Sequence, residues 1–306
     1  MRAELLPDGG AGAASDDFFR SRPFLEAEGV THTLAAGGLH LPVIVREIPD
    51  SDRLDAISPY GYPGGKGSDR AAAPAPGDVD WSGTGLVSLF VRDRIGAPPC
   101  FAGGTERSVV QIHDPSRERG VRSRLAEQIR QNERAGWVVG TTGGPEASDH
   151  QRAAFGALYT ETMTRADAAP RYFYDAGYFE RVMGFSSSWL LLAHSADGNV
   201  QAGALAALSD GLLHYYLGGT ADDALEDSPF KNVVAAMMDL ADQLEVPLNL
   251  GGGVTAGDGL ERFKRGFANA ELPFVTHEVV CDPTAYEELS AGRDADEFFP
   301  AYRAPA

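Results

Sequence analysis

Cysteine is scarce in this 306-residue chain, and no metal-binding spacing is present. The two cysteines, Cys100 and Cys281, lie far apart in the sequence and form no CxxC pair. The seven histidines are scattered, without an HExxH pattern. This distribution argues against a zinc site and against a metal-dependent active site. It favours two unpaired thiols in a reducing compartment over a disulfide.

Long apolar runs are also missing. No stretch reaches 18 consecutive apolar residues, and the N-terminal segment MRAELLPDGGAGAASDD lacks the apolar run of a signal peptide. We therefore expect a cytoplasmic protein with no membrane-spanning helix. The content of 43% hydrophobic and 9% aromatic residues is sufficient for a core, and the length fits about two domains.

Positive charge is in deficit, and lysine is rare. There are 26 Lys and Arg residues against 44 Asp and Glu residues, and Lys66, Lys231 and Lys264 are the three lysines of the chain. A net charge of −18 excludes a globally basic nucleic-acid-binding protein and argues against adhesion to an anionic membrane. A local basic site remains compatible with it, and the rarity of lysine directs attention to each one.

The first half of the chain contains strand and helix patterns separated by long irregular segments. Residues 1–17 are expected to be a flexible N-terminus, and Thr141–Pro145 (TTGGP) has the composition of a domain boundary. Residues 18–145 are thus the predicted N-terminal domain, with residues 68–80 as an insertion. The predicted elements of this half are strands at His40–Ile48, Leu86–Val91, Ser108–His113 and Trp137–Val139, and a helix at Pro115–Ala135.

The second half, residues 146–290, starts with helices and continues with three strands. The strands 187–194, 200–208 and 212–217 are separated by Asp-Gly turns, which predicts two antiparallel hairpins. Next comes a helix at 228–244, with Ser228 as its expected cap, and a buried strand that ends in Gly251-Gly252-Gly253. The predicted final elements are a helix at 258–267, a strand at 274–281, a helix at 283–289, and a tail at 291–306.

Four segments of the second half resemble the FemX/FemAB-like branch of the GNAT acyltransferase superfamily, also described as the BioF2-like acetyltransferase domain. They are HYYLGGT at 214–220, SPFKN at 228–232, LNLGGG at 248–253 and DGLERFKRGF at 258–267. The "GGG…DGL..FK.GF" portion is the most specific element, and the likeness covers roughly residues 150–282. In the first half, DAISPYGY at 55–62 is similar to the "SPYGY" segment of the same branch.

The resemblance implies an α/β (α+β) fold with two tandem GNAT-like domains, each a mixed, mostly antiparallel sheet flanked by helices. It also implies transfer of an amino acid from aminoacyl-tRNA to an amine, without a cofactor. Lys264 matches the lysine of the "FK" motif. A fixed ammonium group directed at the carbonyl oxygen of an ester stabilises the negative charge that develops when an amine attacks.

Other site residues are expected around Lys264 and in the "SPYGY" loop. Because Tyr215 and Tyr216 alternate along a strand, one of them faces the substrate, and Tyr216 is the candidate for catalysis beside Lys264. The candidates for binding the donor are Tyr215, Gly218, Lys231, Asn232, Gly252, Gly253, Arg262 and Arg265. The candidates for binding the acceptor are Ser58, Tyr60, Tyr62 and Lys66. Asp258 is expected to cap the helix that carries Lys264, and His214 to be structural.

One segment departs from the pattern of acetyl-CoA enzymes. Their pyrophosphate loop, Q/R-x-x-G-x-G/A, presents free backbone N–H groups at a helix start. The corresponding segment here, Asp227–Asn232, has no glycine, and Pro229 lacks an N–H group. Residues 219–245 also carry seven acidic residues and one lysine. Both features favour a tRNA ester over acyl-CoA as the donor.

Residues 116–135 carry six arginines and three glutamates. Arg122, Arg130 and Arg134 are candidates for phosphate contacts through their planar guanidinium groups, although a solvated helix face has the same composition.

The leading hypothesis is therefore an aminoacyl-tRNA-dependent transferase that acts on the amine of a small or peptide-like acceptor in natural-product biosynthesis. Two alternatives stay open: an N-acyltransferase that uses acyl-CoA or an acyl-carrier protein, and a non-catalytic GNAT-like binding module. The sequence leaves the amino acid, the acceptor and the oligomeric state undefined.

Overall fold

The computed structural model describes the chain except for residues 68–72, 254, 256, 294–297 and 305–306. It divides the chain into two compact units. Unit 1 comprises Met1–Ser108 and Pro273–Ala306, and unit 2 comprises Val109–Leu272. The chain passes from one unit to the other within β6 (Thr105–His113) and within β12 (Ala270–Val280). This division differs from the predicted boundary at residue 145, because unit 1 takes its last strand and helix from the C-terminal end of the chain.

Unit 1 contains a mixed sheet of strand order β1-β2-β3-β4-β5-β12. The pairs are antiparallel except for β4 and β5, which are parallel. Phe18, Phe19 and Phe24 contribute a buried aromatic cluster. The remaining elements of this unit are β1 (Ala3–Leu6), α1 (Arg22–Ala27), β2 (His32–Ala36), β3 (Leu39–Glu47), β4 (Leu54–Ile57), β5 (Leu86–Arg92) and α7 (Pro283–Ser290).

Both chain ends of unit 1 are more ordered than the sequence predicts. Within the segment expected to be flexible, β1 pairs with β2, and Ala3 and Ala13 are fully buried. In the C-terminal segment, Tyr302 is buried, and its hydroxyl group donates a hydrogen bond to Asp55 at 3.2 Å. The prediction of an unstructured N-terminus is thus wrong for residues 3–6. The predicted insertion at 68–80 lies partly outside the described residues.

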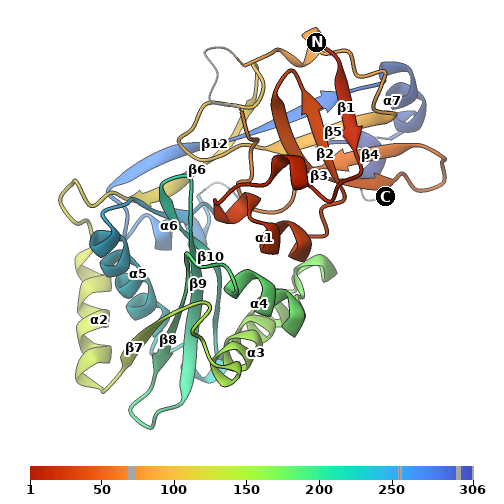
Figure 1. The fold of residues 1–306 in the computed structure, drawn as a ribbon. Coiled ribbons are helices and arrows are strands. Elements are labelled where there is room, and N and C mark those ends of the chain that lie inside the picture. Colours follow the sequence, from red (N-terminus) through yellow and green to blue (C-terminus); the bar gives the residue numbers. More distant parts are fainter. Residues whose placement is uncertain (68–72, 254, 256, 294–297, 305–306) are drawn as a thin grey trace. The chain divides into compact units, whose positions relative to one another are not determined.

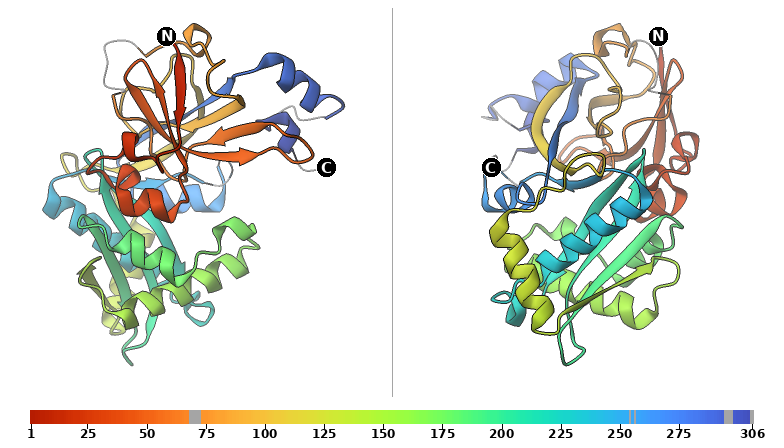
Figure 2. Two further views of the ribbon diagram at one scale, coloured as in Figure 1. Left: turned by 45° about the vertical axis from the view of Figure 1, so that its right-hand side comes forward. Right: turned by 90° about the vertical axis from the view of Figure 1, so that its left-hand side faces the viewer.

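Unit 2 is built on the strand order β6-β11-β10-β9-β8-β7. Only β10 and β11 are parallel among its pairs of described strands. The helices α5 and α2 cover one side of these strands, and α3 and α4 cover the other (Figures 1 and 2). The elements are α2 (Ser123–Arg134), β7 (Val138–Gly143), α3 (Asp149–Arg165), α4 (Ala176–Met183), β8 (Ser188–His194), β9 (Val200–Ser209), β10 (Leu212–Thr220), α5 (Phe230–Leu244), β11 (Leu248–Gly251) and α6 (Gly259–Lys264).

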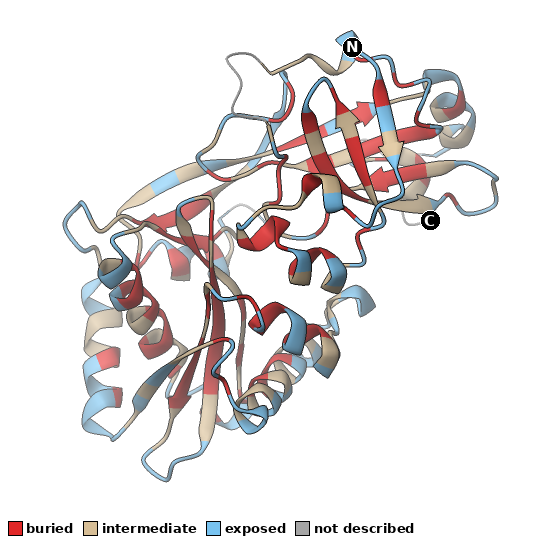
Figure 3. Ribbon diagram, viewed as in Figure 1, coloured by how far each residue is buried: buried red, intermediate tan, exposed pale blue. Residues whose placement is uncertain are grey.

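Local sequence explains most of these boundaries. Asp210 and Gly211 both have positive φ, at 52° and 76°, which is the geometry that a tight two-residue hairpin between β9 and β10 requires. Ser148 and Gln151 form a reciprocal capping box at the start of α3. The strands of unit 2 and the inner face of α5 supply a common core, with Leu191, Met237 and Leu248 fully buried (Figure 3).

Three local predictions in unit 2 are corrected. Thr141–Gly143, expected to be a boundary turn, belongs to β7 and pairs with β8. The helix expected from Pro115 begins only at Ser123. Ser228 does not cap α5, because its φ of 52° is left-handed and its hydroxyl group donates to the carbonyl oxygen of Leu225. The predicted fold class is confirmed: a mixed sheet flanked by helices, with GNAT-like order in unit 2.

Candidate functional site

The parallel strands β10 and β11 pair over two positions only, Leu213 with Leu248 and His214 with Asn249. Beyond His214 the register of β10 shifts, with a β-bulge between Tyr215 and Leu217. β11 ends at Gly251, whose φ of 78° turns the chain away. The sequence candidates Tyr215 and Tyr216 on one strand, and Gly252 and Gly253 after the other, therefore follow the point where pairing ends.

Two buried polar side chains fix this point. The ring of His214 contacts the carbonyl oxygen of Ser209 at 3.2 Å and the amide of Asn249 at 3.1 Å. The Asn249 side-chain oxygen accepts a hydrogen bond from the N–H of Gly251 at 2.8 Å. Burial lowers the pKa of His214 to about 4, so its ring is neutral at physiological pH. His214 has a structural role, as the sequence indicated.

Lys264 is held beside this point from the last turn of α6. Its ammonium group donates a hydrogen bond to the carbonyl oxygen of Gly252 at 2.8 Å and lies 5.5 Å from the ring centre of Tyr215. The residue is only 9% exposed. Burial lowers the pKa of Lys264 to about 8, and the carboxylate of Asp258 partly opposes this shift. Lys264 is thus a buried, oriented amine that titrates near neutrality, unlike a solvated lysine.

The loop after β11 is tied to the start of α6. One carboxylate oxygen of Asp258 accepts from the N–H of Glu261 at 2.7 Å, and the other accepts from the N–H of Thr255 at 3.0 Å. A Cβ atom on Gly253 would lie 2.5 Å from an Asp258 oxygen, so only glycine permits this approach. The predicted capping role of Asp258 is confirmed, and the cap explains the position of Lys264.

The two neighbouring tyrosines contact different helices. Tyr215 packs against Phe230 of α5, with ring centres 5.6 Å apart, and lies under Lys264 of α6. The hydroxyl group of Tyr216 is hydrogen-bonded to that of Tyr178 in α4. α4 and α5 lie on opposite sides of the strands (Figure 1). The structure therefore pairs Lys264 with Tyr215 instead of Tyr216, which remains a candidate on the other side of the sheet.

The start of α5 contributes one structural residue and one cation. Asn232 is buried, accepts a hydrogen bond from Asn132 at 2.8 Å and donates to the carbonyl oxygen of Ile129, so it joins α5 to α2. The N–H groups of Lys231 and Asn232 donate to the carbonyl oxygens of Ser228 and Pro229. These amides are therefore already occupied. The side chain of Lys231 is half-buried, and burial and the nearby Arg124 guanidinium lower its pKa.

Most of the other predicted donor contacts have partners inside unit 2. Gly218 is packed closely, since a Cβ atom there would lie 2.5 Å from the Tyr215 hydroxyl group. Arg262 donates to the carbonyl oxygen of Gly257 at 2.6 Å. Arg265 forms ion pairs with Glu261 and Glu271. On α2, Arg130 and Arg134 both pair with Glu127.

The predicted acceptor residues belong to unit 1, where their polar groups support the loop itself. The buried Ser58 hydroxyl oxygen accepts from the N–H of Arg92 at 3.0 Å. The Tyr62 ring packs edge-on against Phe19 and Phe274. Tyr60 is exposed, and its backbone N–H donates to Glu28. Lys66 is exposed, and its backbone pairs with His40. Acceptor binding by these four residues remains a prediction.

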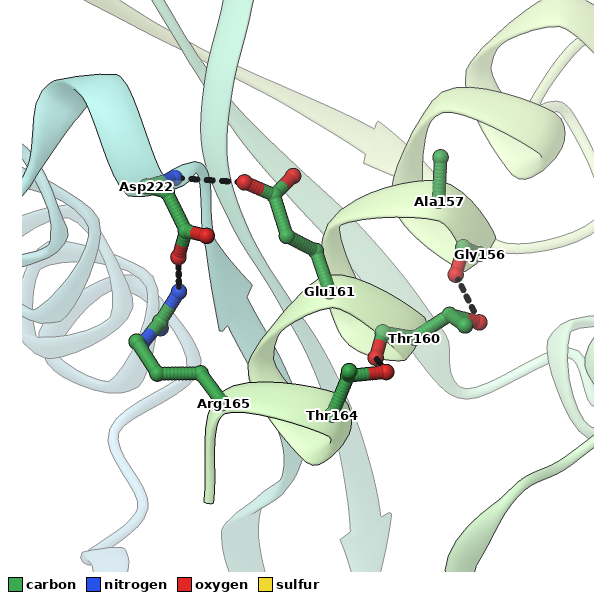
Figure 4. A pocket seen from close by; sticks show the side chains of 7 residues that line it. All are labelled: Gly156, Ala157, Thr160, Glu161, Thr164, Arg165 and Asp222. Carbon is green, nitrogen blue, oxygen red and sulfur yellow. Dashed lines mark hydrogen bonds and ion pairs between the residues drawn. The ribbon is translucent and has the colours of Figure 1, made fainter. Parts of the chain in front are cut away.

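An open hollow of about 680 Å³ lies along α3, apart from the residues just described (Figure 4). Arg165 pairs with Asp222 there, and Glu161 accepts a hydrogen bond from the N–H of Asp222 at 2.6 Å. None of the predicted site residues lines this hollow.

The sequence interpretation missed two residues beside the site. Tyr178 holds the Tyr216 hydroxyl group, and Arg124 lies near Lys231. Tyr178 belongs to an aromatic helix, which gives no signal of a contact with a distant strand. Arg124 belongs to the arginine-rich segment of residues 116–135, but its spacing does not distinguish it from the neighbouring arginines.

Among the described residues no cluster of His, Cys, Asp and Glu side chains has a metal-binding arrangement, and no described helix is long and apolar enough to cross a membrane. Cys100 and Cys281 are both free.

Comparison with known proteins supports a GNAT type of fold for this arrangement, in which a lysine lies beside the end of the β10/β11 pairing. Residues 119–265 match the family model described as the acetyltransferase (GNAT) domain. This match covers most of unit 2 and just under half of the chain. No curated protein matches the chain in sequence.

Solved structures share the fold over most of the chain. FemX superposes with a TM-score of 0.59 at 12% identity, covering 84% of this chain and 89% of FemX. The C-terminal domain of a putative lysylphosphatidylglycerol synthetase from Agrobacterium fabrum gives 0.61 at 13% identity, with 89% of each chain covered. L-PGS from Bacillus licheniformis gives 0.53 at 11% identity, with coverage of 84% and 86%. The predicted likeness to FemX is thus confirmed at the level of the fold.

Proposed function

We propose that this protein is an aminoacyltransferase that takes an amino acid from aminoacyl-tRNA and forms an amide bond on the amine of a small or peptide-like acceptor. The observation that carries the proposal is Lys264, buried beside the end of the β10/β11 pairing with its ammonium group directed by Gly252. FemX and the lysylphosphatidylglycerol synthetase domain share the fold, and the second name describes an aminoacylated product. These likenesses support aminoacyl transfer broadly.

The proposed reaction is direct attack of the acceptor amine on the ester carbonyl carbon. A C–N bond forms, the ester C–O bond breaks, and the proton lost by the amine is transferred to the departing ribose oxygen. Lys264, protonated below pH 8, is placed to stabilise the negative charge on the carbonyl oxygen. Removal of one such donor in an enzyme typically costs a factor of about 10² to 10³ in rate.

The start of α5 supports an ester of tRNA over acyl-CoA. A CoA pyrophosphate needs free N–H groups at the helix start, whereas those of Lys231 and Asn232 already donate to Ser228 and Pro229. We further propose that the acceptor is a cytoplasmic metabolite or peptide of natural-product biosynthesis, in line with the net charge of −18, which disfavours an anionic membrane surface.

The second candidate function is N-acyl transfer from acyl-CoA or an acyl-carrier protein, favoured by the description of the matching family as acetyltransferases. The test supplies purified protein with a charged, labelled tRNA pool and amine acceptors, and measures label in amide products. Ribonuclease treatment of the charged tRNA before mixing should abolish transfer. Transfer that survives this treatment, or release of free thiol from acyl-CoA, would overturn the tRNA proposal. Unchanged activity of Lys264→Ala would favour a non-catalytic binding module.

A further inference from the structure

The arginines of residues 116–135 fall into two groups in unit 2. Four of them form ion pairs: Arg117 with Asp114, Arg119 with Asp239 and Asp242, and Arg130 and Arg134 with Glu127. The other two, Arg122 and Arg124, are exposed and form no ion pair within the described part of the chain. They flank Ser123, the first residue of α2. Most of this helix is exposed or partly exposed (Figure 3), and its buried residues are Ile129 and Asn132.

Lys231 adds a third cation to this pair. It lies in the first turn of α5, where a positive charge opposes the helix dipole. It forms no ion pair with a described carboxylate, and Arg124 is the charged neighbour that lowers its pKa, in addition to burial. Bringing like charges together raises the free energy of the folded protein. In a chain with 44 acidic residues, this concentration of unneutralised cations calls for an anionic ligand.

These cations adjoin the aromatic cluster that supports Lys264. Phe230, directly before Lys231, packs against both Tyr215 and Phe263, with ring centres 5.6 Å and 6.5 Å away. On the other side, the N–H of Arg122 donates to the carbonyl oxygen of Gly266, and its side chain lies within 3.6 Å of the position of a Cβ atom on Gly266. A ligand bound by these cations would therefore lie next to the reactive lysine.

We propose that Arg122, Arg124 and Lys231 form a surface that binds the sugar–phosphate backbone of the donor RNA next to its acylated end. Guanidinium and ammonium groups are the usual partners of backbone phosphates, and their contacts position a nucleic acid without reading its sequence. The surface rests on the proposed function, since it assigns the partner of the same site. The exposed carboxylates Glu226 and Asp227 precede α5 in sequence and limit the affinity.

The experiment measures binding of unacylated tRNA to the full chain over a range of salt concentrations. Each backbone contact contributes about one unit to the slope of log K against log salt concentration. Arg122→Ala, Arg124→Ala and Lys231→Ala should each reduce the slope by about one, and the triple variant by about three. Arg130→Ala and Arg134→Ala are controls on the same helix, because both arginines pair with Glu127. Their slopes should change less than those of the three variants.

Two results would overturn the surface. One is an equal loss of slope in the variants and the controls, which would mean a general charge effect of α2. The other is an unchanged slope in all variants while binding of coenzyme A falls, which would assign the cations to a nucleotide thioester. Either result can occur while label transfer from tRNA stays sensitive to ribonuclease, so failure of the surface and failure of the proposed function are separable. The unfolding temperature of each variant checks that the loss does not arise from misfolding.

Discussion

Two segments with family motifs, one in each unit, use their polar groups in opposite ways. In the Ser58–Lys66 loop of unit 1, the buried Ser58 hydroxyl group accepts a hydrogen bond from the backbone N–H of Arg92, whereas Lys66 is exposed to solvent. In the Gly251–Lys264 segment of unit 2 the lysine is the buried group, and the backbone of Gly252 directs its ammonium. The comparison teaches that a motif lysine becomes a catalytic candidate only where the fold removes it from water and fixes its direction.

The largest expected effect is the loss of activity on substitution of Lys264, and the lysine of the other segment, Lys66, provides the comparison. Lys264→Met keeps much of the side-chain volume but removes the charge, and it should lower kcat/KM by about 10² to 10³ because an oxyanion donor is lost. Lys66→Met, its counterpart in the exposed loop, should lower kcat/KM by much less, because an acceptor contact of an exposed ammonium group is weakened by solvent. Steady-state kinetics of amide formation measures both. Equal losses in the two variants would remove the contrast between the segments.

The pH dependence of transfer should reveal the protonation state in which Lys264 acts. Since the pKa of Lys264 is about 8, the ammonium form is lost above that pH and the rate of transfer should fall tenfold per pH unit there. Lys264→Arg, which stays charged beyond pH 12, should lack this descending limb even if its rate is lower. A rate that instead rises through pH 8 would identify Lys264 as a base and refute the role of its charge.

In unit 1, the expected effect is on stability instead of activity. Ser58→Ala leaves the N–H of Arg92 without its partner in a buried place and should lower the free energy of unfolding by about 1–3 kcal/mol. Tyr60→Phe, at an exposed position, should change the free energy of unfolding by about 0.5 kcal/mol or less, as is usual for surface substitutions. Urea titration measures both values. A loss of activity in folded Ser58→Ala, without loss of stability, would instead support the predicted role of Ser58 in acceptor binding.

The smallest expected effect distinguishes the two tyrosines. Tyr215→Leu removes the ring beneath the Lys264 ammonium group, a contact worth about 0.5–1 kcal/mol. The descending limb of the pH profile should therefore move down by about half a pH unit. Tyr216→Phe removes the hydrogen bond between the hydroxyl groups of Tyr216 and Tyr178 and should leave that limb in place. If Tyr216→Phe moved the descending limb and Tyr215→Leu did not, Tyr216 would be the partner of Lys264, as the sequence predicts.

The sequence predicts those features of unit 2 that local interactions determine. The Asp-Gly turns and the Asp258 cap depend on residues near each other in the chain, and both are confirmed. The choice between Tyr215 and Tyr216 could not be predicted, because strand alternation separates them without indicating which faces α6, and a bulge follows. The ion pairs that divide the arginines of residues 116–135 into two groups join residues up to 123 positions apart, such as Arg119 and Asp242.

In unit 1 the sequence predicts less, because its structure depends on distant partners. β1 has only four residues, none of them β-branched or aromatic, so its own sequence gives little strand signal, and its pairing with β2 makes it a strand. The division of the chain could not be predicted from the composition of Thr141–Pro145, since Thr141–Gly143 belong to β7, an edge strand of unit 2.

The discontinuous course of unit 1 sets an order for folding. All of unit 2 is encoded between the two parts of unit 1, so unit 2 has every residue that it needs before the second part of unit 1 has been synthesised. Asp55, which is fully buried, belongs to the first part of unit 1. Its ion pair with Arg46 joins residues of the same part, whereas its ion pair with Arg303 and its hydrogen bond from Tyr302 need the second part. A chain shortened before Tyr302 would keep Lys264 and all of unit 2 but would leave the buried carboxylate of Asp55 without Tyr302 and Arg303. We therefore expect such a truncation to lower the yield of folded protein.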